Sequence, residues 1–234
     1  MIFQRTELLL GKENLDKLKS SHVIVFGLGG VGGFAVEALV RAGVGEISVV
    51  DFDTIDITNL NRQIIALQTT VGKLKTEAIK ERALLINPNV VIHDYPIKFS
   101  KDMEDFLFKD KNYSYIIDAI DLITNKLDVI SIAKKRNIPI ISSMGTGNKI
   151  NPTMLEVADI NKTSVCPLAR VIRKELKNRR IKKLKVVYSK ENPRKPENID
   201  GSREKKVNVG SVSFVPSTAG LIIASEVIKD LCNL

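Results

Sequence analysis

The 234-residue sequence contains no tryptophan, four tyrosines, two cysteines and two histidines. Cys166 and Cys232 are too few for a disulfide framework. A chain of this size needs none, because it can bury roughly 70–75% of the surface of its unfolded state. With His22 and His93 the cysteines provide four candidate zinc ligands, but their scattered positions match no recognised metal-site spacing. We therefore interpret both histidines as structural residues.

Long apolar runs are also missing. The sequence has no run of about 18 apolar residues, and its first five residues do not resemble the start of a signal peptide. The apolar stretch Ala219–Val227 is short and is interrupted by Glu226, so it predicts a core helix. We expect no membrane segment and a cytoplasmic location.

Charge is unevenly distributed along the chain, whose formal net charge is +9. Between Arg170 and Lys206, fifteen Lys or Arg residues outnumber five Asp or Glu residues, whereas the remainder is close to neutral. Such a block either contacts a polyanion or forms a solvated surface. The charge alone leaves both interpretations open.

Apolar runs alternate with helix-like segments through the first 145 residues. This order predicts an α/β protein with a Rossmann-like doubly wound sheet, parallel in its N-terminal half. The expected strands are His22–Gly27, Glu46–Asp51, Val90–Tyr95, Tyr115–Ala119 and Pro139–Ser143, and the expected helices are Gly30–Gly43, Lys73–Ile86 and a segment ending at Lys135.

The pattern changes after about residue 145. Met154–Asp159 alternates like an antiparallel strand, so we expect mixed or antiparallel strands to extend the sheet. A single domain over residues 1–234 is predicted, with a nucleotide-binding core at 1–145 and an elaboration at 146–234. The other expected elements of the elaboration are a helix at Cys166–Lys177, a strand at Leu184–Ser189, a long loop at Lys190–Val209 and a helix at Ser217–Leu231.

A glycine-rich loop joins the first expected strand to the first expected helix, with Gly27, Gly29, Gly30 and Gly32 in its six residues. Glycines permit a tight turn and a close backbone approach, so that the helix N-terminus can receive a phosphate. Asp51 ends the next strand, where a carboxylate can hold a ribose hydroxyl. Alone, this combination favours a dinucleotide such as NAD or FAD.

Three further residues favour a triphosphate. Arg62 can form a planar fork onto phosphate oxygens, and Lys75 can supply a point charge. Asp121 follows the fourth strand and can hold Mg²⁺ at the carboxyl edge of the sheet. Each base taken singly is typical of an ordinary surface residue, but their occurrence together with the glycine loop favours ATP.

Five motifs together resemble the ubiquitin-activating-enzyme-like adenylating superfamily, which includes the ThiF and MoeB sulfur-carrier activators. These motifs are GLGGVG, VVDFD, NLNRQ, VGKLK and IIDAID, and the resemblance spans about residues 5–143. It implies ATP–Mg²⁺ chemistry, in which a substrate carboxylate attacks the α-phosphate to give an acyl-adenylate and pyrophosphate. The resemblance implies nucleotide binding by Gly27, Gly29, Gly30, Gly32, Asp51, Asp53, Asn59, Asn61, Arg62, Gln63 and Lys75.

The same resemblance assigns catalytic roles. Asn59, Arg62 and Lys75 address the phosphates, and Asp121 holds the metal. Arg5 matches an arginine that reaches the γ-phosphate from a partner subunit, which implies a homodimer. Two departures stand out: Gly33 replaces a serine of many members, and Leu122 replaces the asparagine of the sulfur-carrier activators. Neither departure removes a charged catalytic group.

Further motifs resemble one branch, the tRNA threonylcarbamoyladenosine dehydratases. They are SMGTGNK at 143–149, NPT at 151–153, CPLAR at 166–170 and GSVSFVP at 210–216, and the chain lacks the CxxC pairs of many sulfur-carrier activators. The branch uses ATP to activate the carboxylate of a threonylcarbamoyl group on an adenosine beside the anticodon. The activated acyl group then cyclises with net loss of water.

A tRNA substrate would give the basic segment 170–206 a role, because tRNA binding needs phosphate-neutralising charge outside the ATP pocket. Tyr188 is the only aromatic residue in the segment, so we expect contacts to phosphates and shape rather than base stacking. The candidate tRNA-binding residues are Arg179, Arg180, Lys182 and Lys183.

Several alternatives stay open. Adenylation of a sulfur-carrier C-terminus is the main competing enzymatic function, and a non-catalytic nucleotide-sensing scaffold is a third hypothesis. Cys166 precedes a helix, which can lower a thiol pKa, but the cyclisation needs no thioester, so we interpret this residue as structural. A monovalent-cation site, sulfur-relay or redox partners, and an adenylate or phosphate intermediate remain open.

Overall fold

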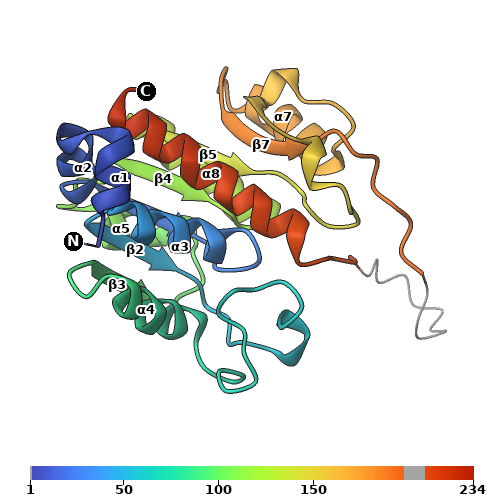
Figure 1. Cartoon of the computed structure of the whole chain (residues 1–234). Coiled ribbons are helices and arrows are strands. Elements are labelled where there is room, and N and C mark those ends of the chain that lie inside the picture. The colour runs from blue at the N-terminus through green and yellow to red at the C-terminus, as the bar shows by residue number, and fades with distance from the viewer. Residues whose placement is uncertain (1, 198–208) are drawn as a thin grey trace.

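The computed structural model describes residues 2–197 and 209–234 and places a seven-stranded sheet at their centre (Figure 1). The strand order is β3-β2-β1-β4-β5-β7-β6, and every neighbouring pair is parallel except β6 with β7. The predicted fold class is therefore confirmed. The strands are β1 (His22–Phe26), β2 (Glu46–Val50), β3 (Val91–Tyr95), β4 (Tyr115–Asp118), β5 (Ile140–Ser143), β6 (Leu155–Asp159) and β7 (Lys185–Ser189).

Helices cover both faces of the sheet, and the side chains of β1 are accordingly buried on both faces. Val23 and Val25 belong to the apolar core on one face, whereas Ile24 and Phe26 belong to the core on the other face. Burial on both faces explains the continuous apolar run in this strand. The helices are α1 (Gln4–Leu10), α2 (Lys12–Lys19), α3 (Gly32–Ala42), α4 (Lys75–Ile86), α5 (Glu104–Phe108), α6 (Ile123–Lys135), α7 (Pro167–Asn178) and α8 (Phe214–Cys232).

The chain order creates a crevice between β1 and β4. From β1 the chain proceeds through α3 to β2 and then through α4 to β3, on one side. It then crosses to β4 on the other side of β1 and continues through α6 to β5. Ligands of open α/β sheets bind at such a switch point, outside the carboxyl ends of the strands.

The C-terminal elaboration continues the same sheet and then returns to its centre. β7 adds parallel to β5, and β6 adds antiparallel to β7 at the edge. α8 then packs lengthwise on α3 (Figure 1). Gly220 permits the close approach, since a Cβ there would lie 2.3 Å from the carbonyl oxygen of Val31. The contact brings the start of α8 beside the glycine loop.

Several helices differ from the sequence-based expectations. α1, α2 and α5 were not expected, and they are short: α1 has seven residues and buries none of them. α8 begins at Phe214 rather than Ser217, because Pro216 lies in the first turn, where a missing N–H costs no hydrogen bond. Of the expected loop at 190–209, residues 198–208 lie outside the described residues, and 190–197 contain no helix or strand.

No helix in the described ranges is long and apolar enough to cross a membrane.

Candidate functional site

One pocket at the carboxyl edge of β1, β2 and β4 gathers most of the candidate site residues. It occupies the crevice between β1 and β4 that the strand order creates. The sequence-predicted residues that line it are Gly27, Gly29, Gly30, Asp51, Asp53, Asn59, Arg62, Gln63, Lys75 and Asp121. Gly32, Asn61 and Arg5 do not line it.

The glycine loop is shaped by two close backbone approaches. Gly27 has a φ of +88°, a region that favours glycine. A Cβ at Gly32 would lie only 1.8 Å from the carbonyl oxygen of Gly27, so no other residue fits there without moving the loop. Gly29 faces open space. Gly32 therefore fixes the shape of the loop, while Gly27, Gly29 and Gly30 line the pocket.

Asp51 ties the glycine loop to the end of β2. Its carboxylate accepts hydrogen bonds from the backbone N–H of Leu28 at 2.6 Å and of Asp53 at 2.9 Å. Burial raises the pKa of Asp51, an effect opposed by Lys75 and these two N–H donors. A carboxylate has about four lone-pair sites. Asp51 therefore retains acceptor capacity for a ligand hydroxyl in the pocket.

Lys75 is held in the pocket wall by an ion pair. Its Nζ lies 2.7 Å from Oδ2 of Asp53, and its side chain is only 7% exposed. A bridge between Thr54 and Leu74 brings the two segments together. Since an ammonium group has three donors, Lys75 can contact Asp53 and an anionic ligand at once.

Arg62 lies at the exposed side of the same pocket. Its Nη1 donates to the carbonyl of Thr58 at 3.0 Å and to Oδ1 of Asn61 at 2.9 Å. Asn61 in turn donates to the carbonyl of Ser211 at 3.0 Å. Asn61 therefore orients Arg62 and connects it to the C-terminal segment, which accounts for its position outside the pocket lining.

Asp121 is exposed on the pocket wall just after β4. Within the described residues, its carboxylate accepts no hydrogen bond and forms no ion pair. A carboxylate oxygen without a protein partner in the described residues, on the wall of this pocket, is a suitable ligand for a hard cation such as Mg²⁺.

A buried ion pair anchors β4, the strand that precedes Asp121. Lys126 Nζ lies 2.7 Å from Asp118 Oδ2, and neither side chain is exposed to solvent. The same ammonium donates to Ser142 Oγ at 3.2 Å and to the Ser143 carbonyl at 2.9 Å. These contacts join the carboxyl ends of β4 and β5. Sequence reasoning missed the pair because a lysine within a helix usually faces solvent.

The elaboration also contributes to the pocket. Thr146, Ser211 and Pro216 line it, and a Cβ on Gly30 would lie 3.1 Å from Pro216 Cβ. The motifs that contain these residues were identified in the sequence, but nothing in the sequence placed them beside the glycine loop. The pocket is therefore completed by residues remote from the nucleotide-binding motifs.

Arg5 lies far from the pocket of its own chain. It is exposed on α1, and the neighbouring Phe3 and Glu7 line a separate hollow with Gly43 and Glu46. Glu46 begins β2, so this hollow is at the amino edge of the sheet, opposite the pocket. Within one chain Arg5 cannot reach a nucleotide in the pocket.

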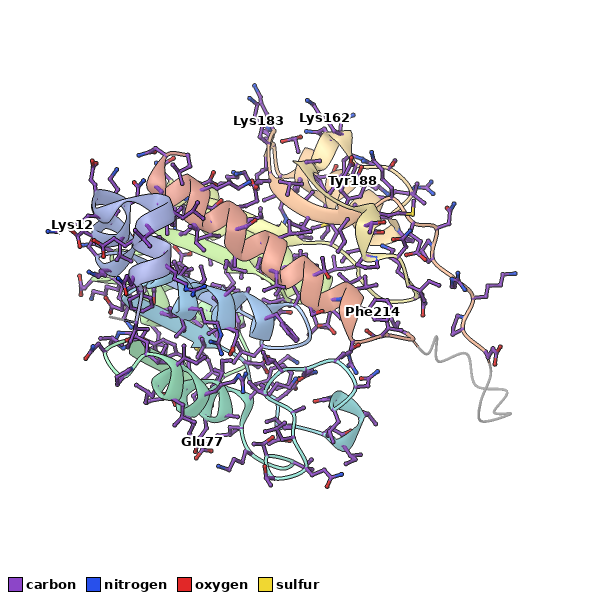
Figure 2. The ribbon with its side chains drawn as sticks, in the orientation of Figure 1. Lys12, Glu77, Lys162, Lys183, Tyr188 and Phe214 are labelled. Atoms are coloured by element: carbon purple, nitrogen blue, oxygen red, sulfur yellow. The ribbon has the colours of Figure 1, made fainter. Side chains whose placement is uncertain are left out.

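The basic residues of the C-terminal elaboration surround α7. This helix runs from the carboxyl ends of the strands toward their amino ends. Its start is near Gly145, whose added Cβ would lie 3.8 Å from Leu168 Cβ, and the turn that follows α7 leads to the amino end of β7. Figure 2 shows Lys183, between α7 and β7, away from Phe214 at the start of α8. The side chains that line a groove here, which we call the basic groove, are Asn161, Arg170, Arg173, Lys174, Lys177, Arg180, Ile181 and Lys182.

One arginine of the basic groove, Arg173, and one of the four predicted tRNA contacts, Arg179, are engaged within the fold. Arg173 Nη1 donates to the Thr163 carbonyl at 2.8 Å. Arg179 Nη1 lies 3.3 Å from Asp128 Oδ1 and donates to Ser131 Oγ at 3.0 Å. Arg180 and Lys182, by contrast, are exposed along the basic groove.

Residues 3–234 match the model of the ThiF family. The chain belongs to the ThiF family. Among curated proteins it is 44% identical to the tRNA threonylcarbamoyladenosine dehydratase of Bacillus subtilis, over 98% of this chain and 94% of that protein. It is 34% identical to the protein of the same name from Haemophilus influenzae, over 94% of this chain and 88% of the relative.

Among solved structures, this ThiF-family chain is similar in fold to a dehydratase of the same name. The E. coli tRNA N6-threonylcarbamoyladenosine dehydratase TcdA, solved in complex with ATP, superposes with a TM-score of 0.90 at 33% identity. The match covers 99% of this chain and 93% of that one. The similarity therefore includes the elaboration after residue 145 as well as the nucleotide-binding half.

Proposed function

We propose that this ThiF-family chain is an ATP-dependent tRNA threonylcarbamoyladenosine dehydratase. The observation that carries the proposal is the convergence of Arg62, Lys75 and Asp121 on one pocket beside the glycine loop. The relatives that match over nearly the whole chain carry the same name. The alternative, adenylation of a sulfur-carrier protein, has no comparable support over residues 146–234.

The pocket has polar groups suited to ATP. Asp51 retains acceptor capacity for a ribose hydroxyl, and the backbone of the glycine loop can receive phosphate oxygens. Gln63 Oε1 lines the pocket, is buried and lacks a hydrogen-bond partner within the described ranges. A buried acceptor of this kind is costly unless a ligand satisfies it. ATP therefore fits the donor and acceptor pattern of the wall.

Asp121 is the residue that would hold Mg²⁺, and the ion would neutralise charge on the phosphate oxygens. Arg62 and Lys75 stabilise the negative charge that develops as the bond between the α-phosphorus and pyrophosphate breaks. The attacking atom is a carboxylate oxygen of the threonyl group, and the new bond joins it to the α-phosphorus.

Cyclisation follows without an enzyme nucleophile. The neighbouring carbamoyl group attacks the activated carbonyl carbon, AMP leaves, and the two steps together remove one water from the modified adenosine. An internal nucleophile held in place has a large effective concentration. Cys166 is only 3% exposed, which supports a structural role for its thiol.

The proposed active form is a homodimer in which Arg5 of each chain completes the pocket of the other. The position of Arg5 at the amino edge supports this arrangement, since its own pocket is at the opposite edge. Arg5→Ala and Asp121→Ala should each be inactive, whereas their equimolar mixture should regain about a quarter of wild-type activity through mixed dimers of twofold symmetry. No recovery after verified subunit exchange would contradict a contribution from the partner.

We also propose that tRNA lies along the basic groove, with the modified adenosine in the pocket. α7 has twelve residues, so it spans about 18 Å at 1.5 Å per residue. Its start adjoins Gly145, next to the pocket residue Thr146. Residues 1–145 and 146–234 thus act as one domain, with the first part binding nucleotide and the second binding tRNA.

The test is mass spectrometry of nucleosides from threonylcarbamoyladenosine-containing tRNA after incubation with the protein and ATP. We expect the modified nucleoside to lose the mass of one water, and Asp121→Ala to leave it unchanged. Pyrophosphate release that depends on a Gly-Gly-ended protein and not on the tRNA would support the sulfur-carrier alternative instead.

A further inference from the structure

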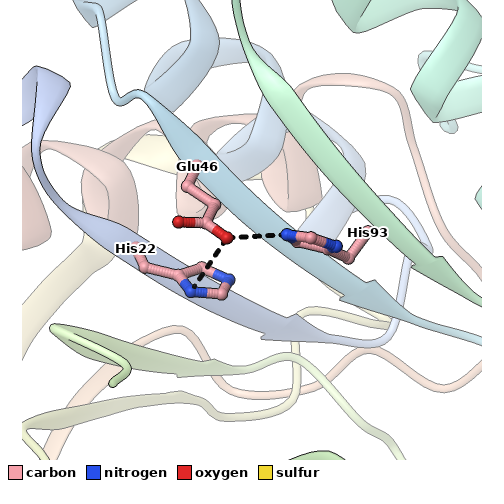
Figure 3. Close-up of side chains that lie close together, drawn as sticks. All are labelled: His22, Glu46 and His93. Atoms are coloured by element: carbon pink, nitrogen blue, oxygen red, sulfur yellow. Dashed lines mark hydrogen bonds and ion pairs between the residues drawn. The ribbon is translucent and has the colours of Figure 1, made fainter. Parts of the chain in front are cut away.

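Both histidines of the chain meet around one carboxylate at the amino edge of the sheet (Figure 3). His22 and Glu46 begin the adjacent strands β1 and β2, and His93 lies on β3 opposite Ser48. Glu46 Oε1 is 2.6 Å from His93 Nε2 and 3.5 Å from His22 Nδ1. Strand pairing and the two-residue side-chain period place these groups on one face.

We propose that this cluster, His22–Glu46–His93, binds a zinc-class divalent metal ion. Two imidazoles and a carboxylate form a donor set typical of zinc. One ligand atom from each residue lies within 4.8 Å of the other two. A fourth position remains for water, as in zinc sites with three protein ligands.

The distances fit a tetrahedral ion after a small shift. Zinc–ligand bonds of about 2.0–2.2 Å place the ligand atoms about 3.3–3.5 Å apart. The separation of His22 Nδ1 from Glu46 Oε1 is already 3.5 Å. His93 would have to withdraw from Glu46 by somewhat less than about 1 Å. The side chains of His93 and Glu46 are 38% and 41% exposed, so they can move and an ion can enter from solvent.

The surroundings of His22 support a ligand role. Its Nε2 lies 2.9 Å from Ser48 Oγ, and Tyr113 packs against its ring with centroids 4.5 Å apart. When Nε2 carries the proton and donates to the serine, Nδ1 presents its lone pair to the cluster. Metal-binding histidines usually hold their second nitrogen in this way. Ser48 and Tyr113 thus hold the buried imidazole in position.

The metal would link β1, β2 and β3 without contacting the nucleotide pocket. β1 separates His22 from the glycine loop by five residues, or about 16 Å of extended chain. Zinc binding should therefore stabilise the fold without changing ATP affinity. This inference does not depend on the proposed function.

The experiment uses the full-length protein without a histidine tag, treated with chelator and titrated with ZnCl₂. Calorimetry should give one ion per chain, and the melting temperature should rise by about 5–10 °C at 100 times the dissociation constant. MgCl₂ should have no such effect, because Mg²⁺ prefers oxygen ligands. ATP affinity should be the same with and without zinc.

Two variants and a control locate the site. His93→Gln keeps a polar group near Glu46 and should weaken zinc binding by at least the roughly 10–100-fold that follows loss of an outer partner. Glu77→Gln removes an exposed carboxylate on α4 and should bind zinc like the wild type. Absence of zinc binding by the wild type, or equal affinity in His93→Gln, would overturn the proposal. If His93→Gln fails to fold, Glu46→Gln replaces it, and equal affinity in that variant is equally decisive.

Discussion

Replacing Lys177, Arg180 and Lys182 by Glu reverses the charge of the basic groove without touching the ATP pocket. All three side chains are exposed and line the groove, and none accepts or donates a side-chain hydrogen bond within the described residues. Arg179 is left in place because it contacts Asp128 and Ser131 of α6. The change therefore tests tRNA binding rather than folding.

The expected magnitude follows from counterion release. Three neutralised phosphates contribute about 2.1–2.7 units to the slope of log affinity against log salt. Between roughly 50 and 200 mM salt, these contacts alone should weaken wild-type tRNA binding by about 20–40-fold. The triple variant should lose this part of the slope and should bind tRNA weakly even at low salt, because glutamates repel phosphates.

Filter binding or fluorescence anisotropy at several salt concentrations measures the slope, and ATP binding without tRNA provides the second readout. ATP affinity should change little, since charges separated by more than about 8–10 Å are largely screened. A matched control replaces Lys12, Lys101 and Lys109, which are equally exposed on other elements, by Glu. An unchanged slope in the groove variant, or an equal loss in the control, would refute the assignment of tRNA binding to the groove.

Asp121→Ala and Arg62→Ala should each reduce ATP turnover by roughly 10²–10³-fold while the melting temperature stays within error, because Asp121 is exposed, Arg62 is only half-buried, and both act on phosphate charge. Pyrophosphate release measures turnover, and near-wild-type rates would contradict the adenylation chemistry. Lys126→Met should lower the free energy of unfolding by about 3–5 kcal/mol, because it leaves the carboxylate of Asp118 buried without its cation. Urea denaturation gives this value, and a loss below about 1 kcal/mol would show that the pair is not structural. Cys166→Ala should keep most of the dehydratase activity; a hundredfold loss in a stably folded variant would restore a covalent step.

Local patterns determined most of the helices and strands and identified most of the residues that line the pocket. The run of β1 is continuous because both faces of that strand are buried, and this is visible in five consecutive residues. The glycine loop was recognisable because Gly27 and Gly32 satisfy backbone constraints within a few residues of each other. Arg62, Lys75 and Asp121 are farther apart in sequence, but each belongs to a recognisable motif, so their convergence on one pocket could be predicted.

Contacts between distant segments had no local pattern and depended on the tertiary structure. The buried partner of Lys126 is set by how α6 packs on β4 and β5, and the engagement of Arg179 is set by how the α7 turn meets α6. Thr146, Ser211 and Pro216 reach the pocket because β5 ends there and α8 packs back onto α3. Sequence motifs identified these segments but did not show that they lie beside the pocket.

The two histidines show most clearly that sequence spacing does not reveal which side chains are close in the folded chain. By sequence spacing, His22 and His93 offered no metal site, since known zinc motifs space their ligands a few residues apart. The parallel order β3-β2-β1 brings the starts of the strands to one edge, and the register sets Glu46 between the two imidazoles. The sequence determines which side-chain groups are present. Which of them lie close together across a sheet depends on strand order and register, and these exist only in the folded chain.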